Sequence, residues 1–441
     1  MIKIGMSTVA LTEALRPSAP IREPIEAVVL FVSDGTHSSL WCELDFMDFN
    51  RCVTDTLGKA VSRATGVSRD MVHILTTHNH GGGTPDLDTL AEILASGAER
   101  AMNGARAARM RYAFTKSEKQ INILRRLYVP ELDATGTLYF GAAEENGFNS
   151  SLFAESLVTA LENGKLSNAM GEHTDRPCVA FSRGDEEIVA VEFVSLEGET
   201  IGSLVRFAAH AVCANRPGSY SSDYPYYVRS VMKESLGGEA MFMNGPCAEI
   251  APAMINKLEG REQPLGKYIA ETALRALKNA ELTEIVGYAD GKCEIRLPVR
   301  REVLENFVDV SSQMPEELSE RKRYLERLGL RRTLPFLYEK YAEGESSLSD
   351  TVPIYLGFLR LGELVLVAFP GETFWATGAA VKAAFPDIRI CTVTEHERTV
   401  MYLPPYDEFL RGGYESICKT TAPESESILR REAIKKLVTF L

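Results

Sequence analysis

Two histidines and a run of glycines stand together in the first fifth of the chain. The apolar segment Met71–Leu75 predicts a buried strand, and Thr76-Thr77-His78-Asn79-His80-Gly81-Gly82-Gly83 follows it. Side chains two residues apart on a strand share one face, so this spacing predicts both imidazoles on the same side. The glycines would let the backbone turn sharply and approach a ligand closely. A metal corner and a simple pair of polar histidines at a strand end both fit this pattern.

Three further strands lead to polar side chains that could take part in chemistry. The returning strands of three predicted hairpins reach Asp45, His210 and Glu372; the hairpins pair 27–31 with 39–46, 188–195 with 200–208, and 354–361 with 364–369. Enzymes of the α/β type place their chemistry at strand ends. Zinc takes three or four nitrogen, oxygen or sulfur ligands, so His78, His210 and Glu372 could form one site.

The composition limits the kinds of partner that we expect. The chain has 441 residues, of which 45% are apolar and 25% charged, and its formal net charge is −13. This charge argues against a nucleic-acid surface and against binding to an anionic membrane. No apolar run is long enough to span a membrane, and the N-terminus lacks the apolar core of a signal peptide. Eight scattered cysteines without a CxxC pair suit reduced thiols, so we expect a cytoplasmic protein.

The remaining patterns predict the elements that must position these side chains. Helices are expected over 48–66, Leu87–Arg111, 264–279 and 425–440, and residues 301–345 read as mostly helical and strongly charged. Together with the hairpins, they predict an α/β fold: a single large domain over residues 1–441, with mixed β-sheets covered by helices and the metal site at strand ends. Residues 301–345 would form a helical insertion or a lid.

Four motifs resemble those of the neutral/alkaline ceramidases, in the same order. Thr77-His78-Asn79-His80-Gly81-Gly82-Gly83 resembles their Thr-His-Thr-His-Ser-Gly-Pro motif, and Phe207-Ala208-Ala209-His210 resembles their second metal-histidine strand. Phe369-Pro370-Gly371-Glu372 is similar to their Pro-Gly-Glu segment. The fourth motif is similar to their tyrosine-rich segment and consists of Tyr402-Leu403-Pro404-Pro405-Tyr406 with Gly413-Tyr414-Glu415 behind it. It keeps the interval of twelve residues between the two outer tyrosines, Tyr402 and Tyr414.

The resemblance implies a role for each matching residue. His78, His210, Glu372 and Tyr402 would bind one zinc ion, although Tyr402 could equally be a packing aromatic. His80 would support the ligands or contact the substrate, and Tyr414 would face the reacting carbonyl. The resemblance thus implies a catalytic domain of this ceramidase type.

Three departures separate this chain from those enzymes. Their nucleophile is the serine of Gly-Asp-Val-Ser-Pro, and the matching run here, Ala248-Glu249-Ile250-Ala251-Pro252, has Ala251 in its place. Without that hydroxyl there is no acyl transfer from this atom. Their Asn-Arg segment has no clear match here, and the nearest run, Phe148-Asn149-Ser150, lacks the arginine. The chain also ends before the C-terminal β-sandwich that those enzymes carry, so ceramide is not the expected substrate.

Several other side chains have a functional and a structural interpretation. Glu249 could be a general base or a structural loop carboxylate. Cys247 reads as a small buried thiol rather than a nucleophile. Asp223 could hydrogen-bond a ligand histidine or begin a helix. His396 reads as a surface-loop residue, and His73 has no expected role.

The sequence predicts a zinc-dependent hydrolase with one Zn²⁺. It would cleave an amide or ester bond of a small polar substrate by metal-activated water, with His80 or Glu249 handling the proton and Tyr414 as a further catalytic residue. A non-hydrolytic descendant that binds a small ligand, and a metal-assisted isomerase or lyase acting on a sugar-like molecule, are the alternatives. We expect a small-molecule substrate, no nucleic acid and no membrane, and the sequence indicates no particular oligomeric state.

Overall fold

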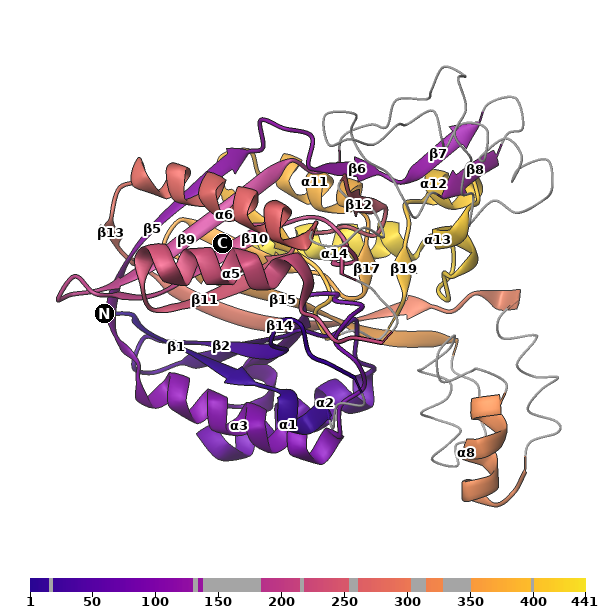
Figure 1. Ribbon diagram of the computed structural model, residues 1–441. Coiled ribbons are helices and arrows are strands. Elements are labelled where there is room, and N and C mark those ends of the chain that lie inside the picture. Colours follow the sequence, from indigo (N-terminus) through magenta and orange to yellow (C-terminus); the bar gives the residue numbers. More distant parts are fainter. Residues whose placement is uncertain are drawn as a thin grey trace.

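Two β-sheets face each other at the centre of the protein (Figure 1). The structure is a computed structural model that describes residues 1–15, 19–129, 134–137, 184–214, 218–253, 261–302, 315–327, 350–397 and 400–441. The large sheet has the strand order β11-β10-β9-β5-β1-β2-β3-β4, with β13 paired to β5. Its strands are β1 (Lys3–Ala10), β2 (Glu26–Ser33), β3 (Ser38–Leu44), β4 (Val72–Thr76), β5 (Arg106–Lys116), β9 (Glu187–Ser195), β10 (Thr200–Phe207), β11 (Glu239–Asn244) and β13 (Thr283–Glu284).

The second sheet is smaller and has the order β14-β15-β16-β18. Its strands are β14 (Tyr288–Pro298), β15 (Thr351–Leu361), β16 (Leu364–Ala368) and β18 (Arg389–Val393). Both sheets mix antiparallel hairpins with parallel pairs, which are β3 with β4, β10 with β11, and β16 with β18. Three short ladders lie outside the sheets and pair β6 (Asn122–Leu124) with β12 (Ile250–Pro252), β7 (Arg126–Val129) with β8 (Ala134–Thr137), and β17 (Glu372–Thr373) with β19 (Tyr402–Leu403).

Helices cover the outer face of each sheet. The chief covering helices are α2 (Arg51–Thr65), α3 (Leu87–Asn103), α5 (Asp223–Leu236) and α6 (Glu262–Lys278) on the large sheet, and α11 (Trp375–Ala383) and α14 (Ser425–Phe440) on the small one. The other described helices are α1 (Thr12–Leu15), η1 (Arg69–Met71), α8 (Leu318–Arg327), α12 (Tyr406–Leu410) and α13 (Tyr414–Ile417). The layers therefore run helix, sheet, sheet, helix.

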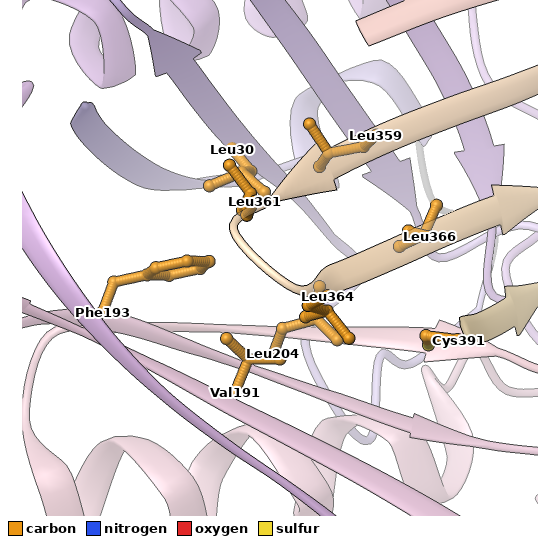
Figure 2. A pocket seen from close by; sticks show the side chains of 9 residues that line it. All are labelled: Leu30, Val191, Phe193, Leu204, Leu359, Leu361, Leu364, Leu366 and Cys391. Carbon is orange, nitrogen blue, oxygen red and sulfur yellow. The ribbon is translucent and has the colours of Figure 1, made fainter. Parts of the chain in front are cut away.

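The alternation of side chains along each strand builds this arrangement. In β2, Val28, Leu30 and Val32 face the second sheet, whereas Ala27, Val29 and Phe31 face the helices, as expected for a strand buried on both faces. Figure 2 shows the space between the sheets, where a cavity of about 20 Å³ is bordered only by apolar side chains and one thiol. They are Leu30, Val191, Phe193, Leu204, Leu359, Leu361, Leu364, Leu366 and Cys391. This cavity belongs to the core, since it offers no polar group that could orient a ligand.

The structure confirms the predicted α/β class with mixed sheets covered by helices. The three predicted hairpins are β2–β3, β9–β10 and β15–β16, and the predicted helix 425–440 is α14. The expectation of one helix from Leu87 to Arg111 was wrong, because the helix ends at Asn103 and β5 begins at Arg106. Of residues 301–345, the structure describes mainly α8, and most of the rest lies outside the described residues. No helix in the described ranges is long and apolar enough to cross a membrane.

Candidate metal centre

Three side chains from distant parts of the sequence meet beyond the ends of three strands. His78 follows β4, His210 follows β10, and Glu372 lies just beyond β16. Each offers one ligand atom, and these three atoms all lie within 4.8 Å of one another. All three residues are buried. The structure thus brings together the two histidines and the glutamate that the sequence placed at strand ends.

Hydrogen bonds fix which ring nitrogen of each histidine carries the proton. Nδ1 of His78 lies 3.0 Å from the carbonyl oxygen of Met47, and Nδ1 of His210 lies 3.0 Å from that of Ile250. A carbonyl oxygen only accepts, so each Nδ1 is the donor and each Nε2 keeps its lone pair. The two Nε2 atoms lie 3.5 and 3.3 Å from Oε2 of Glu372.

This donor set fits a divalent cation. Two nitrogen lone pairs and a carboxylate oxygen converge in a buried space. These electron-rich atoms repel one another, and a positive charge between them would remove that repulsion. Two imidazoles with one carboxylate form a common catalytic zinc set that leaves a coordination position open. Burial, together with the positive charge of Arg125, lowers the pKa of His210 below its ordinary value. The neutral ring that a metal requires is therefore the favoured form.

The loop after β4 is shaped differently from the expected strand corner. β4 ends at Thr76, and His78 has a left-handed backbone with φ of 56°, so the two histidines do not share a strand face. The turn itself brings Nε2 of His80 to 3.4 Å from Nε2 of His78. A Cβ on Gly82 would lie 2.2 Å from the carbonyl oxygen of Asp45. Because Gly82 has no side chain, the loop packs closely against the backbone of Asp45 at this position. The sequence had instead suggested that the glycines let the backbone approach a ligand.

A tight turn places Glu372. Gly371 has φ of 56°, and a Cβ there would lie 2.3 Å from the carbonyl oxygen of Val400, so the position needs glycine. β17 then pairs in parallel with β19, with Glu372 opposite Tyr402. The two segments that the sequence resemblance linked to the metal are therefore hydrogen-bonded neighbours.

Two tyrosines lie beside Glu372. The rings of Tyr402 and Tyr414 meet edge to face, with centroids 5.5 Å apart. Burial, with the negative charge of Glu372, raises the pKa of Tyr402 well above its ordinary value, and burial chiefly raises the pKa of Tyr414 to about 12. Both phenols therefore hold their protons near neutral pH and can donate a hydrogen bond. That Tyr402 binds a metal stays a prediction.

Arg125 is a site residue that the sequence reasoning missed. Its side chain is buried, and it donates to the hydroxyl oxygen of Tyr402 at 3.1 Å, to the carbonyl oxygen of Ala248 at 2.7 Å and to Glu415 at 2.9 Å. It holds Tyr402 beside Glu372 and brings a positive charge to the centre. The available signal was a pair of arginines directly after the apolar Ile123-Leu124. Residues 148–150, the nearest sequence match to the Asn-Arg segment, lie outside the described residues.

The other catalytic candidates differ in position. His80 is exposed and stands at the rim of the cluster, which suits contact with a substrate. The Glu249 carboxylate instead accepts from the backbone N–H of Trp375, at 3.0 and 3.3 Å, at the start of α11. Burial raises its pKa to about 8. This geometry favours the structural interpretation of Glu249.

Three further residues have structural contacts. Burial raises the pKa of the Cys247 thiol well above its ordinary value, as expected for an inert thiol. Asp223 is the first residue of α5 and accepts from the backbone N–H of Ala214 and of Tyr224, which favours its interpretation as a helix-start residue. His396 is fully buried, so its expected place in a surface loop was wrong. It bonds to His73, which the sequence had left without a role.

Comparison with solved structures identifies the fold. Neutral ceramidase from Pseudomonas aeruginosa matches 98% of this chain and 73% of its own, with 16% sequence identity and a TM-score of 0.65. A ceramidase complexed with C2 matches 98% of this chain and 74% of its own, with 15% identity and a TM-score of 0.66. The chain has the neutral ceramidase fold. No protein-family model matches the sequence, and a search of curated proteins also finds no match.

Proposed function

We propose that the protein is a metal-dependent hydrolase that cleaves an amide or ester bond of a small polar molecule, with one zinc ion at His78, His210 and Glu372. The observation that carries this proposal is the convergence of two Nε2 lone pairs on a buried carboxylate oxygen. The structural neighbours are ceramidases, and this likeness supports amide hydrolysis as the reaction of this protein. When bound, zinc polarises a carbonyl group and makes water a stronger nucleophile at neutral pH.

The residues around the cluster each have a task in this proposal. Tyr414 donates its phenol proton in a hydrogen bond to the substrate oxygen as negative charge develops there. His80, at the exposed rim, accepts a proton from the attacking water. Tyr402 would offer its hydroxyl oxygen to the ion, and Arg125 holds that oxygen in place. His80 suits the proton transfer better than Glu249, whose carboxylate is engaged at the start of α11.

Turnover and metal content test this proposal together. We expect the purified protein to hold about one zinc ion per chain and to cleave short-chain amides or esters from a panel. Treatment with a chelator should abolish turnover, and added Zn²⁺ should restore it. A serine-directed fluorophosphonate should leave residues 244–252 unlabelled, because Ala251 offers no hydroxyl. Cleavage of long-chain ceramide at a rate similar to that of short amides would contradict the small polar substrate.

A second candidate function is metal-dependent binding of a small ligand without hydrolysis. The alanine at position 251 favours it, since the serine of the ceramidase motif is absent. A protein that holds zinc and binds members of the panel but turns none of them over would support this candidate and refute the hydrolase.

A further inference from the structure

The segment Thr394–Glu397 touches the turn before Glu372 and the strand that leads to His78. The hydroxyl of Thr394 donates to the carbonyl oxygen of Gly371 at 2.5 Å, directly before Glu372. On the other side, the backbone of His396 pairs with Leu75, and the N–H of Glu397 donates to the carbonyl oxygen of Ile74 at 2.9 Å. The segment thus lies between the end of β4, which leads to His78, and the end of β16, which leads to Glu372.

Glu395 lies behind the candidate ligand His78. Its Oε1 is 3.4 Å from Nδ1 of His78, and its side chain is fully buried. Met47 offers a carbonyl oxygen to the same Nδ1 at 3.0 Å. Two oxygen acceptors therefore face the nitrogen opposite Nε2, which orients the ring and increases the electron density on Nε2.

The backbone of this segment is strained. Glu395 has φ of 59° and Glu397 has φ of 45°, a left-handed conformation that residues other than glycine rarely adopt. Such strain persists only where surrounding bonds hold the backbone in place, and it occurs most often at functional sites.

Two cations, a half-buried Arg69 and Lys292, hold one end of the segment. Arg69 binds the Glu397 carboxylate with both terminal nitrogens, at 3.1 and 2.8 Å, and Nζ of Lys292 lies 2.7 Å from Oε1. The carboxylate also accepts from the backbone N–H of Ile74 at 3.3 Å. A bidentate arginine fixes the direction of a carboxylate as well as its position.

A chain of buried rings fixes the middle of the segment. Nδ1 of His396 donates to the carbonyl oxygen of Tyr355 at 3.1 Å, so its Nε2 accepts from Nδ1 of His73 at 2.9 Å. Nε2 of His73 lies 2.8 Å from Asp290, and the Trp41 ring stacks on His73 with centroids 3.9 Å apart. Strands of both sheets contribute to this chain, so it ties the segment to the rigid core.

We propose that Thr394–Glu397 is a positioning segment for the metal centre, in which Glu395 aims the Nε2 lone pair of His78 and the Arg69–Glu397 pair holds Glu395 in place. The inference rests on the proposed metal function. Glu395 does not touch the ion or the substrate in this arrangement, and its effect passes through His78. Glu395 is then a determinant of metal affinity that lies outside the ligand set.

Metal affinity of matched variants tests the proposal. Glu395→Gln keeps the size of the side chain and removes its charge, and Arg69→Lys keeps the cation and removes the bidentate geometry. We expect Glu395→Gln to weaken Zn²⁺ binding, measured by competition with a chelator, by about tenfold to a hundredfold. Arg69→Lys should give a smaller loss in the same direction. The visible absorption of the Co²⁺-loaded protein should change in both variants, because it reports the geometry of the ligands.

Glu426→Gln is the matched control. Glu426 is also a buried carboxylate, but it accepts from Thr377 and pairs with Arg430 on α14. This variant should lower the thermal midpoint while leaving the Zn²⁺ affinity and the Co²⁺ spectrum unchanged. Unchanged affinity in Glu395→Gln, alongside a zinc-binding wild type, would overturn the positioning role and leave the proposed function standing. A wild-type protein that binds no zinc would overturn both.

Discussion

The buried Glu397 carboxylate gives a quantitative prediction about acid stability. Burial opposes its charge, but Lys292 and Arg69 outweigh burial and lower its pKa from 4.5 to about 2. At about 1.4 kcal/mol for each pH unit, that difference corresponds to about 3 kcal/mol of stability near neutral pH. Because the folded-state pKa is depressed, this stability is present above about pH 4.5 and is lost as the pH falls toward about 2.

Replacing Glu397 with glutamine should therefore lower the free energy of unfolding of the metal-free protein by about 3 kcal/mol at pH 7. Urea unfolding of the wild type and of Glu397→Gln, at several pH values between 7 and about 3, measures this difference. The difference should shrink as the pH falls below about 4.5, since the wild-type carboxyl then takes up its proton. Equal stabilities at pH 7, or a difference that stays constant with pH, would show that the charge of Glu397 does not stabilise the fold. Glu426→Gln again serves as a control for the loss of a buried carboxylate elsewhere.

Three more predictions concern the metal centre and the core. Zn²⁺ at 100 times its Kd should stabilise the wild type by about 2.7 kcal/mol, which raises the thermal midpoint by about 3 °C for 441 residues. His210→Ala should abolish that shift. His37→Ala, which changes an exposed histidine, should keep it. Tyr414→Phe should lower kcat with the zinc content unchanged, and Tyr402→Phe should lower zinc occupancy; unchanged values in both would mark the two rings as packing residues. Leu361→Ala, between the sheets, should lower the free energy of unfolding by about 2–5 kcal/mol, and a loss below about 1 kcal/mol would show that Leu361 contributes little to this core.

The strands were predictable from sequence where short apolar runs flank a tight turn. The hairpin β15–β16 shows this, because its two apolar runs leave only Gly362 and Glu363 for the turn. The boundary between α3 and β5 was missed because Arg106–Lys116 is rich in alanine and arginine, which favour helix. Its pairing with β9 across nine positions, from Ala108 with Ser195 to Lys116 with Glu187, outweighs that local preference, and so distant a partner cannot be read from local composition.

The candidate ligands were predictable because each lies just past the end of a strand with a clear apolar pattern. Arg125 and His396 gave no comparable signal, since their neighbours come from distant segments. Arg125 reaches Tyr402, which is 277 residues away, and His396 reaches His73, which is 323 residues away. Their roles follow from burial, and burial depends on how the two sheets pack together. The residues that support a site are therefore harder to find from sequence than the residues that could bind its metal.

The short strand β12, which carries Ala251, supports the candidate metal centre through its main chain. The carbonyl oxygen of Ile250 accepts from both the backbone N–H and Nδ1 of His210, at 3.2 and 3.0 Å, so this strand fixes the ring of one candidate ligand. The methyl group of Ala251 is buried and packs with Ile123 and Ala253 in a small apolar cluster. These bonds need no side chain at position 251. The candidate metal site can therefore keep its geometry without the serine of the ceramidase motif, which agrees with water as the nucleophile of the proposed hydrolysis.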